Sequence, residues 1–230
     1  MAQSLPALIF DLDGTLTDSK PGILGCLTKT LEERGIPVPA ALDRFIGPPV
    51  EEWVTYLLPE GTREDHVALA RDYRACYDRE GWSNNAVYPG VRELLVELNS
   101  AGIPLYVCTS KHEPFAIRIL DAFELSPLFA AIYGDRLEYP SHAKADLLAR
   151  LLRERGIQAE SAWMIGDRSF DFAAAKANRV RSLAAGWGYG SAVEWALADA
   201  VAASPSQVPA IVLEQPHAAA PVLTQRIVLA

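Results

Sequence analysis

The chain has 230 residues, half of them hydrophobic, and a formal net charge of −8. This length suits one sizeable domain, or one domain with a smaller insertion, and this composition argues against general disorder. The acidic balance argues against nucleic acid as the main partner, because binding to its backbone usually requires a basic face. The negative net charge does not argue against small phosphorylated ligands, because a metal ion and a few local cations can hold them.

The three cysteines are widely spaced and form no Cys-x-x-Cys pattern, since they stand at Cys26, Cys76 and Cys108. They predict neither a disulfide framework nor a structural zinc site, and they fit a reducing compartment. No apolar run approaches the ~18 residues of a membrane span, and the N-terminal region lacks the pattern of a signal peptide. We therefore expect a soluble, cytoplasmic protein without a membrane partner.

The first predicted strand, Ala7–Phe10, is an unbroken apolar run, which is typical of a strand buried on both faces. Asp11 ends the run, Asp13 follows, and Gly14 allows a sharp exit of the backbone. A lone Asp-x-Asp pair can be a solvated loop or a helix cap, but here it closes a buried strand. Two such carboxylates repel each other, and a divalent cation such as Mg²⁺ removes that repulsion. One carboxylate could then attack an electrophile while the other moves a proton.

The segment between residues 17 and 86 predicts helices without a convincing strand. A proline near the start, a closing glycine and apolar residues at helical spacing predict a helix over Ser19–Gly35. A second helical pattern, Ala41–Leu58, is interrupted by a turn at Gly47-Pro48-Pro49. A third helix is expected over Thr62–Glu80, with Thr62 as its cap. Helices at this place in the chain predict an inserted helical bundle, a second domain over residues 17–86.

From Val87 onward, predicted helices and strands alternate. The order is helix Pro89–Ala101, strand Ile103–Cys108, helix Glu113–Phe123, strand Phe129–Tyr133, helix Lys144–Arg155, strand Ala162–Ile165, helix Phe170–Ala177 and strand Val180–Ala184, with one strand and one helix within Ala200–Val212. This alternation predicts an α/β fold with a doubly wound parallel sheet, a core domain formed by residues 1–16 and 87–230. Functional groups then belong at the carboxyl ends of the strands. The sequence predicts no role for the tail, residues 214–230.

Polar residues follow the later strands. Thr109 and Ser110 precede a helix, where hydroxyl and main-chain N–H groups bind phosphate oxygens well or act as a simple helix cap. Lys144 begins a helix, where its charge is slightly unfavourable with the helix dipole. An anionic partner would explain that position, and so would ordinary solvation of a surface lysine.

Asp167 and Asp171 stand one helical turn apart behind another predicted strand. They can be charges that favour the start of a helix and nothing more. Alternatively, Asp167 completes the metal site begun by Asp11 and Asp13. Polar residues in this order at four strand ends favour the second interpretation.

These motifs also match a known family. Phe-Asp-Leu-Asp-Gly-Thr-Leu at 10–16, Thr-Ser at 109–110, Lys144 and Gly-Asp-x-x-x-Asp at 166–171 resemble, in order and rough spacing, the motifs of the haloacid dehalogenase-like (HAD) hydrolase superfamily, most of whose members are phosphatases. The helical insertion resembles the alpha-helical cap of its phosphoglycolate phosphatase-like branch and of related 5′-nucleotidases. Three further stretches resemble that branch, namely Phe45–Pro49, Thr109–Lys111 and Gly186–Ser191. Many relatives have Lys-Pro where this chain has Lys144-Ala145.

The resemblance implies a role for each matched residue. Asp11 would attack phosphorus and form an aspartyl-phosphate, while Asp13 would protonate the leaving oxygen and then activate water. Mg²⁺ would be held by Asp11, the main-chain carbonyl of Asp13 and Asp167, with Asp171 in support. Thr109, Ser110 and Lys144 would bind the phosphoryl oxygens.

A cap over the site implies a small phosphorylated metabolite, such as phosphoglycolate or a nucleoside monophosphate, rather than a phosphoprotein. Arg44, Trp53, Tyr56 and the Gly47-Pro48-Pro49 turn are candidates for lining the cleft, with packing on helix faces as the alternative for the two aromatic residues. Other open functions are a phosphomutase or pyrophosphatase with the same nucleophile, or a non-catalytic binding or regulatory protein. The protein is expected to be a monomer or a homodimer.

Overall fold

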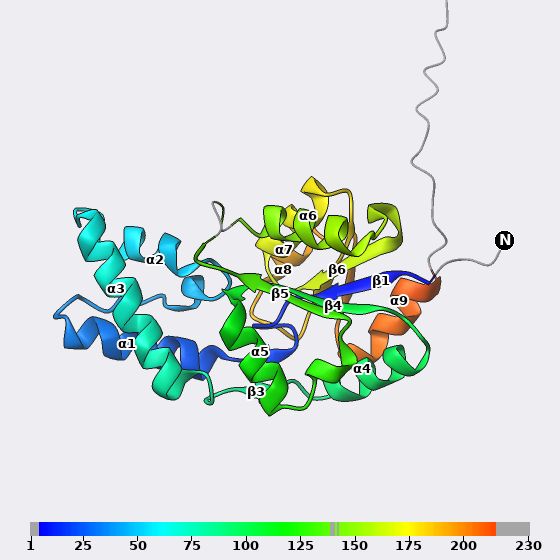
Figure 1. The fold of residues 1–230 in the computed structure, drawn as a ribbon, viewed down its shortest axis with the longest axis horizontal. Coiled ribbons are helices and arrows are strands. Elements are labelled where there is room, and N and C mark those ends of the chain that lie inside the picture. The colour runs from blue at the N-terminus through cyan, green and yellow to red at the C-terminus, as the bar shows by residue number, and fades with distance from the viewer. Residues whose placement is uncertain (1–4, 139–140, 142, 215–230) are drawn as a thin grey trace, which may run out of the picture.

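The computed structural model describes residues 5–138, 141 and 143–214, and a six-stranded sheet forms its centre (Figure 1). The strands lie in the order β5, β4, β1, β6, β7, β8, and the pairs are parallel. The central strand pairs on both sides, with Leu8 opposite Leu105 and Trp163. The parallel α/β architecture is confirmed. Its strands are β1 Ala7–Phe10, β4 Leu105–His112, β5 Ala131–Asp135, β6 Ala162–Gly166, β7 Arg181–Ala185 and β8 Ala200–Ala202.

Helices cover both faces of this sheet (Figure 1). Alternate residues of β1 point to opposite faces, so Leu8 and Phe10 belong to one hydrophobic cluster and Ala7 and Ile9 to the other. This double burial is the reason why the first strand is apolar without a break. The first cluster includes α4 Val91–Ser100, α5 Glu113–Ala122 and α9 Val208–Glu214, and the second includes α6 Lys144–Arg155 and α7 Ser169–Ala177.

Three helices lie together at one end of the molecule, away from most of the sheet (Figure 1). They are packed around a third hydrophobic cluster, which contains Trp53 and Tyr73. Thr62 caps the last of them in a capping box with Asp65, as expected from the sequence. The division into a core domain (1–16 and 87–230) and a cap domain (17–86) stays a prediction, and the word cap is used below for the observed helical unit, residues 20–81. The helices are α1 Lys20–Glu33, α2 Val50–Leu57 and α3 Arg63–Cys76, and a π-helical turn, Tyr77–Gly81, continues α3.

The expectation that residues 17–86 contain no strand is wrong at both ends of this segment. β2, Thr17–Asp18, pairs antiparallel with β3, Ala86–Val87, where the chain enters and leaves the helical unit. Strands of two residues are too short to show a sequence period, and their pairing joins positions far apart in the chain.

The end of β4 differs from the sequence prediction as well. β4 continues past Cys108 to His112, which pairs with Asp135 of β5 after a shift in register. Thr109 and Ser110 therefore lie within the strand, and Lys111 and His112 separate them from α5. The structure also contains shorter elements, α8 Ala192–Trp195 and 3₁₀ turns at Asp43–Phe45, Ser126–Leu128, Ala159–Ser161 and Pro205–Gln207. In the part of the chain that the structure describes, no helix is both long enough and apolar enough to cross a membrane.

The central strand should dominate the stability of the fold. Leu8 is 0% exposed, so Leu8→Ala should lower the free energy of unfolding by about 2–5 kcal/mol through lost burial and a residual cavity. Leu197 is 67% exposed, and Leu197→Ala should change it by less than about 0.5 kcal/mol. Urea denaturation of both variants measures the difference. Equal losses would contradict the central placement of β1.

Candidate active site

The structure brings the predicted site residues together at the carboxyl ends of neighbouring parallel strands. Asp11 and Asp13 follow β1, Thr109 lies in β4, and Asp167 follows β6. Lys144 is the first residue of α6, and Asp171 lies in the first turn of α7. Each of these six side chains is buried, with at most 8% of the residue exposed. Their charges must therefore be balanced by one another or by a ligand, not by bulk water.

Lys144 connects two carboxylates inside this site. Its Nζ atom lies 2.7 Å from Oδ1 of Asp11 and 2.5 Å from Oδ1 of Asp171. Burial alone would lower the pKa of Lys144, but the charges of Asp11 and Asp171 raise it above its usual value. The lysine thus remains positively charged. Its two carboxylate partners explain why a cation stands at the start of α6, where the helix dipole alone would disfavour it.

Asp11, Asp167 and Asp171 form a buried acidic cluster, whose carboxylate oxygens lie within 4.8 Å of one another. Burial, followed by the charges of Asp171 and Asp11, raises the pKa of Asp167 well above its usual range. Lys144 supplies a single positive charge against three acidic groups. Carboxylate oxygens are also the ligands that small divalent cations such as Mg²⁺ prefer. The residues present therefore fit a divalent cation.

Asp13 has a different partner, although it stands only two residues after Asp11. Its Oδ2 atom lies 2.9 Å from Nζ of Lys111, which also donates a hydrogen bond of 2.8 Å to the hydroxyl of Tyr77 in the cap. Lys111 is not among the site residues predicted from the sequence. The available signal was its place next to Thr109 and Ser110, in the stretch Thr109–Lys111 that resembles the family.

A glycine-rich loop, residues 186–191, holds the two acidic loops in place. A Cβ atom at Gly188 would lie 2.1 Å from the carbonyl oxygen of Gly14, and one at Gly190 would lie 1.9 Å from that of Asp167. Only glycine allows this approach. Between them, Tyr189 donates its main-chain N–H to Asp167 Oδ2 at 2.8 Å and its hydroxyl to Asp18 at 2.8 Å. The loop thus contacts both the acidic cluster and the first crossing into the cap.

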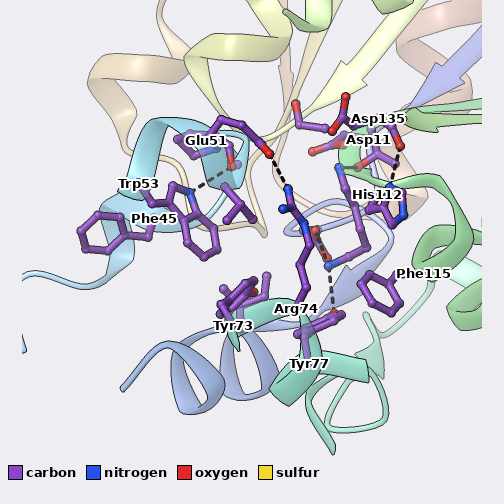
Figure 2. A pocket seen from close by; sticks show the side chains of 18 residues that line it. Asp11, Phe45, Glu51, Trp53, Tyr73, Arg74, Tyr77, His112, Phe115 and Asp135 are labelled. Atoms are coloured by element: carbon purple, nitrogen blue, oxygen red, sulfur yellow. Dashed lines mark hydrogen bonds and ion pairs between the residues drawn. The ribbon is translucent and has the colours of Figure 1, made fainter. Parts of the chain in front are cut away.

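A cavity of about 60 Å³ lies between the strand ends and the cap helices (Figure 2). Ser110 lines it together with Asp11, Asp13 and Thr109, so the candidate phosphate-binding residues border the same cavity as the candidate nucleophile. The cap contributes aromatic side chains and one cation, namely Phe45, Trp53, Tyr73, Tyr77 and Arg74.

The cleft candidates from the sequence separate into two places. Trp53 and Gly47 line the cavity, and Trp53 is also 5% exposed with its ring 4.9 Å from that of Tyr73, so it packs as well. The prediction that Arg44 and Tyr56 line this cavity is wrong. The guanidinium carbon of Arg44 lies 3.9 Å from the Tyr56 ring centroid, and both line another groove, of about 280 Å³, beside Phe170.

Comparison with known proteins assigns the family. The family described as haloacid dehalogenase-like hydrolase matches residues 8–185, which include the whole acidic cluster. The chain belongs to this family. The crystal structure of a "predicted phosphatase" from Clostridium acetobutylicum has a TM-score of 0.86 and 32% identity, over 92% of this chain and 100% of the other.

Curated relatives carry different names. A 5′-nucleotidase of Pseudomonas aeruginosa is 39% identical over 81% of this chain and 85% of its own. A phosphoglycolate phosphatase of Rhodospirillum rubrum is 37% identical over 80% of each. The tyrosine-protein kinase PtkA of Mycobacterium tuberculosis is 39% identical over 83% of this chain, but the match spans only 65% of PtkA.

Binding of a divalent cation should stabilise the fold, because the cluster exists only in the folded chain. With Mg²⁺ at 100 times its dissociation constant, the free energy of unfolding should rise by ~2.7 kcal/mol over protein in EDTA. Asp167→Asn removes one charge at similar size and should lose most of this rise. Urea denaturation with and without Mg²⁺ measures it.

Asp121→Asn, at an exposed position of α5, is the matched control and should keep the full response to Mg²⁺. An equal response in Asp167→Asn and Asp121→Asn would contradict a cation site at the acidic cluster.

Proposed function

We propose that this protein is a phosphatase that hydrolyses small phosphomonoesters through an aspartyl-phosphate on Asp11. The observation that carries this proposal is the separate pairing of two adjacent carboxylates, Asp11 with Lys144 and Asp13 with Lys111. Two carboxyl groups in different electrostatic surroundings can serve as nucleophile and as proton carrier in the same reaction. The relatives named 5′-nucleotidase and phosphoglycolate phosphatase support the substrate class, a small phosphorylated metabolite.

In the first step, a carboxylate oxygen of Asp11 attacks phosphorus and forms an acyl-phosphate bond. The ester P–O bond on the opposite side breaks, and its oxygen leaves with a proton from Asp13. Asp13 lines the cavity in which the leaving group would lie. The ion pair with Lys144 fixes the position of the Asp11 carboxylate.

In the second step, the deprotonated Asp13 takes a proton from water while the water oxygen attacks phosphorus. The bond between phosphorus and Asp11 breaks, which releases inorganic phosphate and restores both carboxyl groups. We propose that Thr109, Ser110 and Lys144 hold the phosphoryl oxygens, since Thr109 and Ser110 line the cavity beside Asp11.

Asp11, the main-chain carbonyl of Asp13 and Asp167 would hold Mg²⁺, with Asp171 in support. When bound, the ion would offset negative charge on the phosphoryl oxygens and on the attacking carboxylate. We propose this assignment because Asp11, Asp167 and Asp171 lie close enough to share one cation. A cytoplasmic location and a monomeric or homodimeric state stay predictions.

A second candidate follows from the similarity to a relative named tyrosine-protein kinase. In that case, a tyrosine hydroxyl would replace water as the acceptor of the phosphoryl group on Asp11. Transfer to a second hydroxyl of the substrate would give a phosphomutase. Product analysis separates these reactions, because hydrolysis alone releases one inorganic phosphate for each ester bond broken.

Phosphate release from a panel of small phosphomonoesters tests the proposal. The wild type should release phosphate with Mg²⁺ and not with EDTA, and Asp11→Asn should lower kcat by at least about 1,000-fold. Asp13→Asn should form the aspartyl-phosphate from p-nitrophenyl phosphate, whose leaving group needs no proton, and should hydrolyse it slowly. Rapid-quench labelling follows that intermediate.

Asp121→Asn serves as the control and should keep wild-type turnover. If Asp11→Asn kept its activity, Asp11 would not be the nucleophile. If the wild type released no phosphate from any member of the panel, a non-catalytic role would be favoured.

A further inference from the structure

The cavity beside Asp11 has two permanently charged cations among the described residues that line it, Lys111 and Arg74. Lys111 is paired with the carboxylate of Asp13. Arg74 belongs to the cap, and its ion-pair partner is Glu51 rather than Asp11 or Asp13. The two-step reaction above therefore gives it no role. Its place in the wall of the cavity makes it a candidate contact for the part of the substrate that leaves.

Arg74 stands in the last turn of α3 and extends into the cavity, with its guanidinium group toward the side where Asp11 lies (Figure 2). Only 21% of its side chain is exposed. One of its nitrogens, Nη2, lies 2.5 Å from Oε1 of Glu51 on α2. A guanidinium group has five N–H donors, so this contact leaves others for a second acceptor.

Aromatic rings line the cavity that this guanidinium group enters. Trp53, Tyr73 and Tyr77 line the same cavity, and successive ring centroids among them lie 4.9 Å and 6.0 Å apart. Such walls exclude water and lower the local dielectric constant, which strengthens an ion pair formed inside them. A buried anion would therefore gain more from Arg74 than from a lysine on the surface.

The size of the cavity limits what can carry that anion. Its volume of about 60 Å³ is far below the ~300–1,000 Å³ of pockets that enclose drug-sized ligands. A nucleoside would need the cap to move away, whereas a leaving group of two or three carbons would not. With the cap placed as it is, the cavity favours a compact leaving group.

We propose that Arg74 determines specificity by binding a carboxylate on the leaving group, so that the preferred substrates are small phosphomonoesters of hydroxy acids. This inference rests on the proposed phosphatase activity at Asp11. The planar guanidinium group matches a carboxylate through two parallel hydrogen bonds, while Glu51, which also lines the cavity, pairs with one of its nitrogens and keeps it oriented. An uncharged leaving group of equal size cannot form this pair.

A pair of matched substrates tests the assignment, 2-phosphoglycolate and 2-hydroxyethyl phosphate, which differ in one carboxylate. The wild type should prefer 2-phosphoglycolate in kcat/KM by about 10- to 100-fold, the range of a charge-assisted bidentate pair. Arg74→Gln should abolish this preference through its effect on 2-phosphoglycolate, and should change kcat/KM for 2-hydroxyethyl phosphate by less than about threefold.

Arg71→Gln is the matched control, because Arg71 lies one turn earlier on the same helix with 73% of its side chain exposed. It should keep the preference of the wild type. If Arg74→Gln fails to fold, Arg74→Lys replaces it. A lysine keeps the charge and lacks the planar fork, so it should lose most of the preference and keep turnover of 2-hydroxyethyl phosphate.

A binding measurement separates this inference from the proposed function. Asp11→Asn is titrated with both compounds by calorimetry, with and without the added change Arg74→Gln. Tighter binding of 2-phosphoglycolate that depends on Arg74 supports the role of Arg74 even where no turnover is seen. Equal effects of Arg74→Gln on both compounds would overturn it, as would a wild type that prefers nucleoside monophosphates, while hydrolysis itself would remain established.

Discussion

The site depends on the balance of buried charge at the carboxyl ends of the parallel strands. Asp11, Asp167 and Asp171 are nearly inaccessible to solvent, and Lys144 forms ion pairs with Asp11 and Asp171. Burying unpaired charges costs several kcal/mol each, so such a cluster persists only where opposite charges are held close. The sheet supplies that closeness, because parallel strands end at the same edge and direct their following loops to one place.

The remaining architecture serves this balance in two ways. The main chain of the glycine-rich loop at 186–191 packs directly against the main chain of the acidic loops, at Gly14 and Asp167. No larger residue at Gly188 or Gly190 would permit this approach. The cap closes the cavity from the other side and contributes Tyr77 to the cation that pairs with Asp13. Core and cap thus meet at a hydrogen bond beside the candidate proton carrier, so the position of the cap affects the environment of Asp13.

Much of the fold could be predicted because its signals are local. The apolar run of β1, the helical spacing of α1 and the capping box at Thr62 are all visible within a few residues. Asp11, Asp13, Asp167 and Lys144 could be found for a related reason, since each stands where a strand ends or a helix begins. Their convergence then follows from the parallel sheet.

Other features depend on partners far along the chain and left no local signal. β2 and β3 are two residues each and exist only through their pairing. The role of Lys111 follows from its ion pair with Asp13, and that of Arg74 follows from the cavity that it lines. Arg44 and Tyr56 were placed in the wrong cleft because the sequence does not show which face of the cap meets the core.

The place of β1 at the centre of the sheet also determines when the core can form. β1 comes before the helical insertion in the sequence, while its two neighbours, β4 and β6, come after it. The contacts of Leu8 with Leu105 and Trp163 must therefore close long loops before they give any stability, which makes sheet formation slow compared with local helix formation. A nascent chain that has emerged only as far as α3 carries this fully buried strand without a partner. During synthesis, its apolar side chains have to be kept from other molecules until residue 165 has left the ribosome.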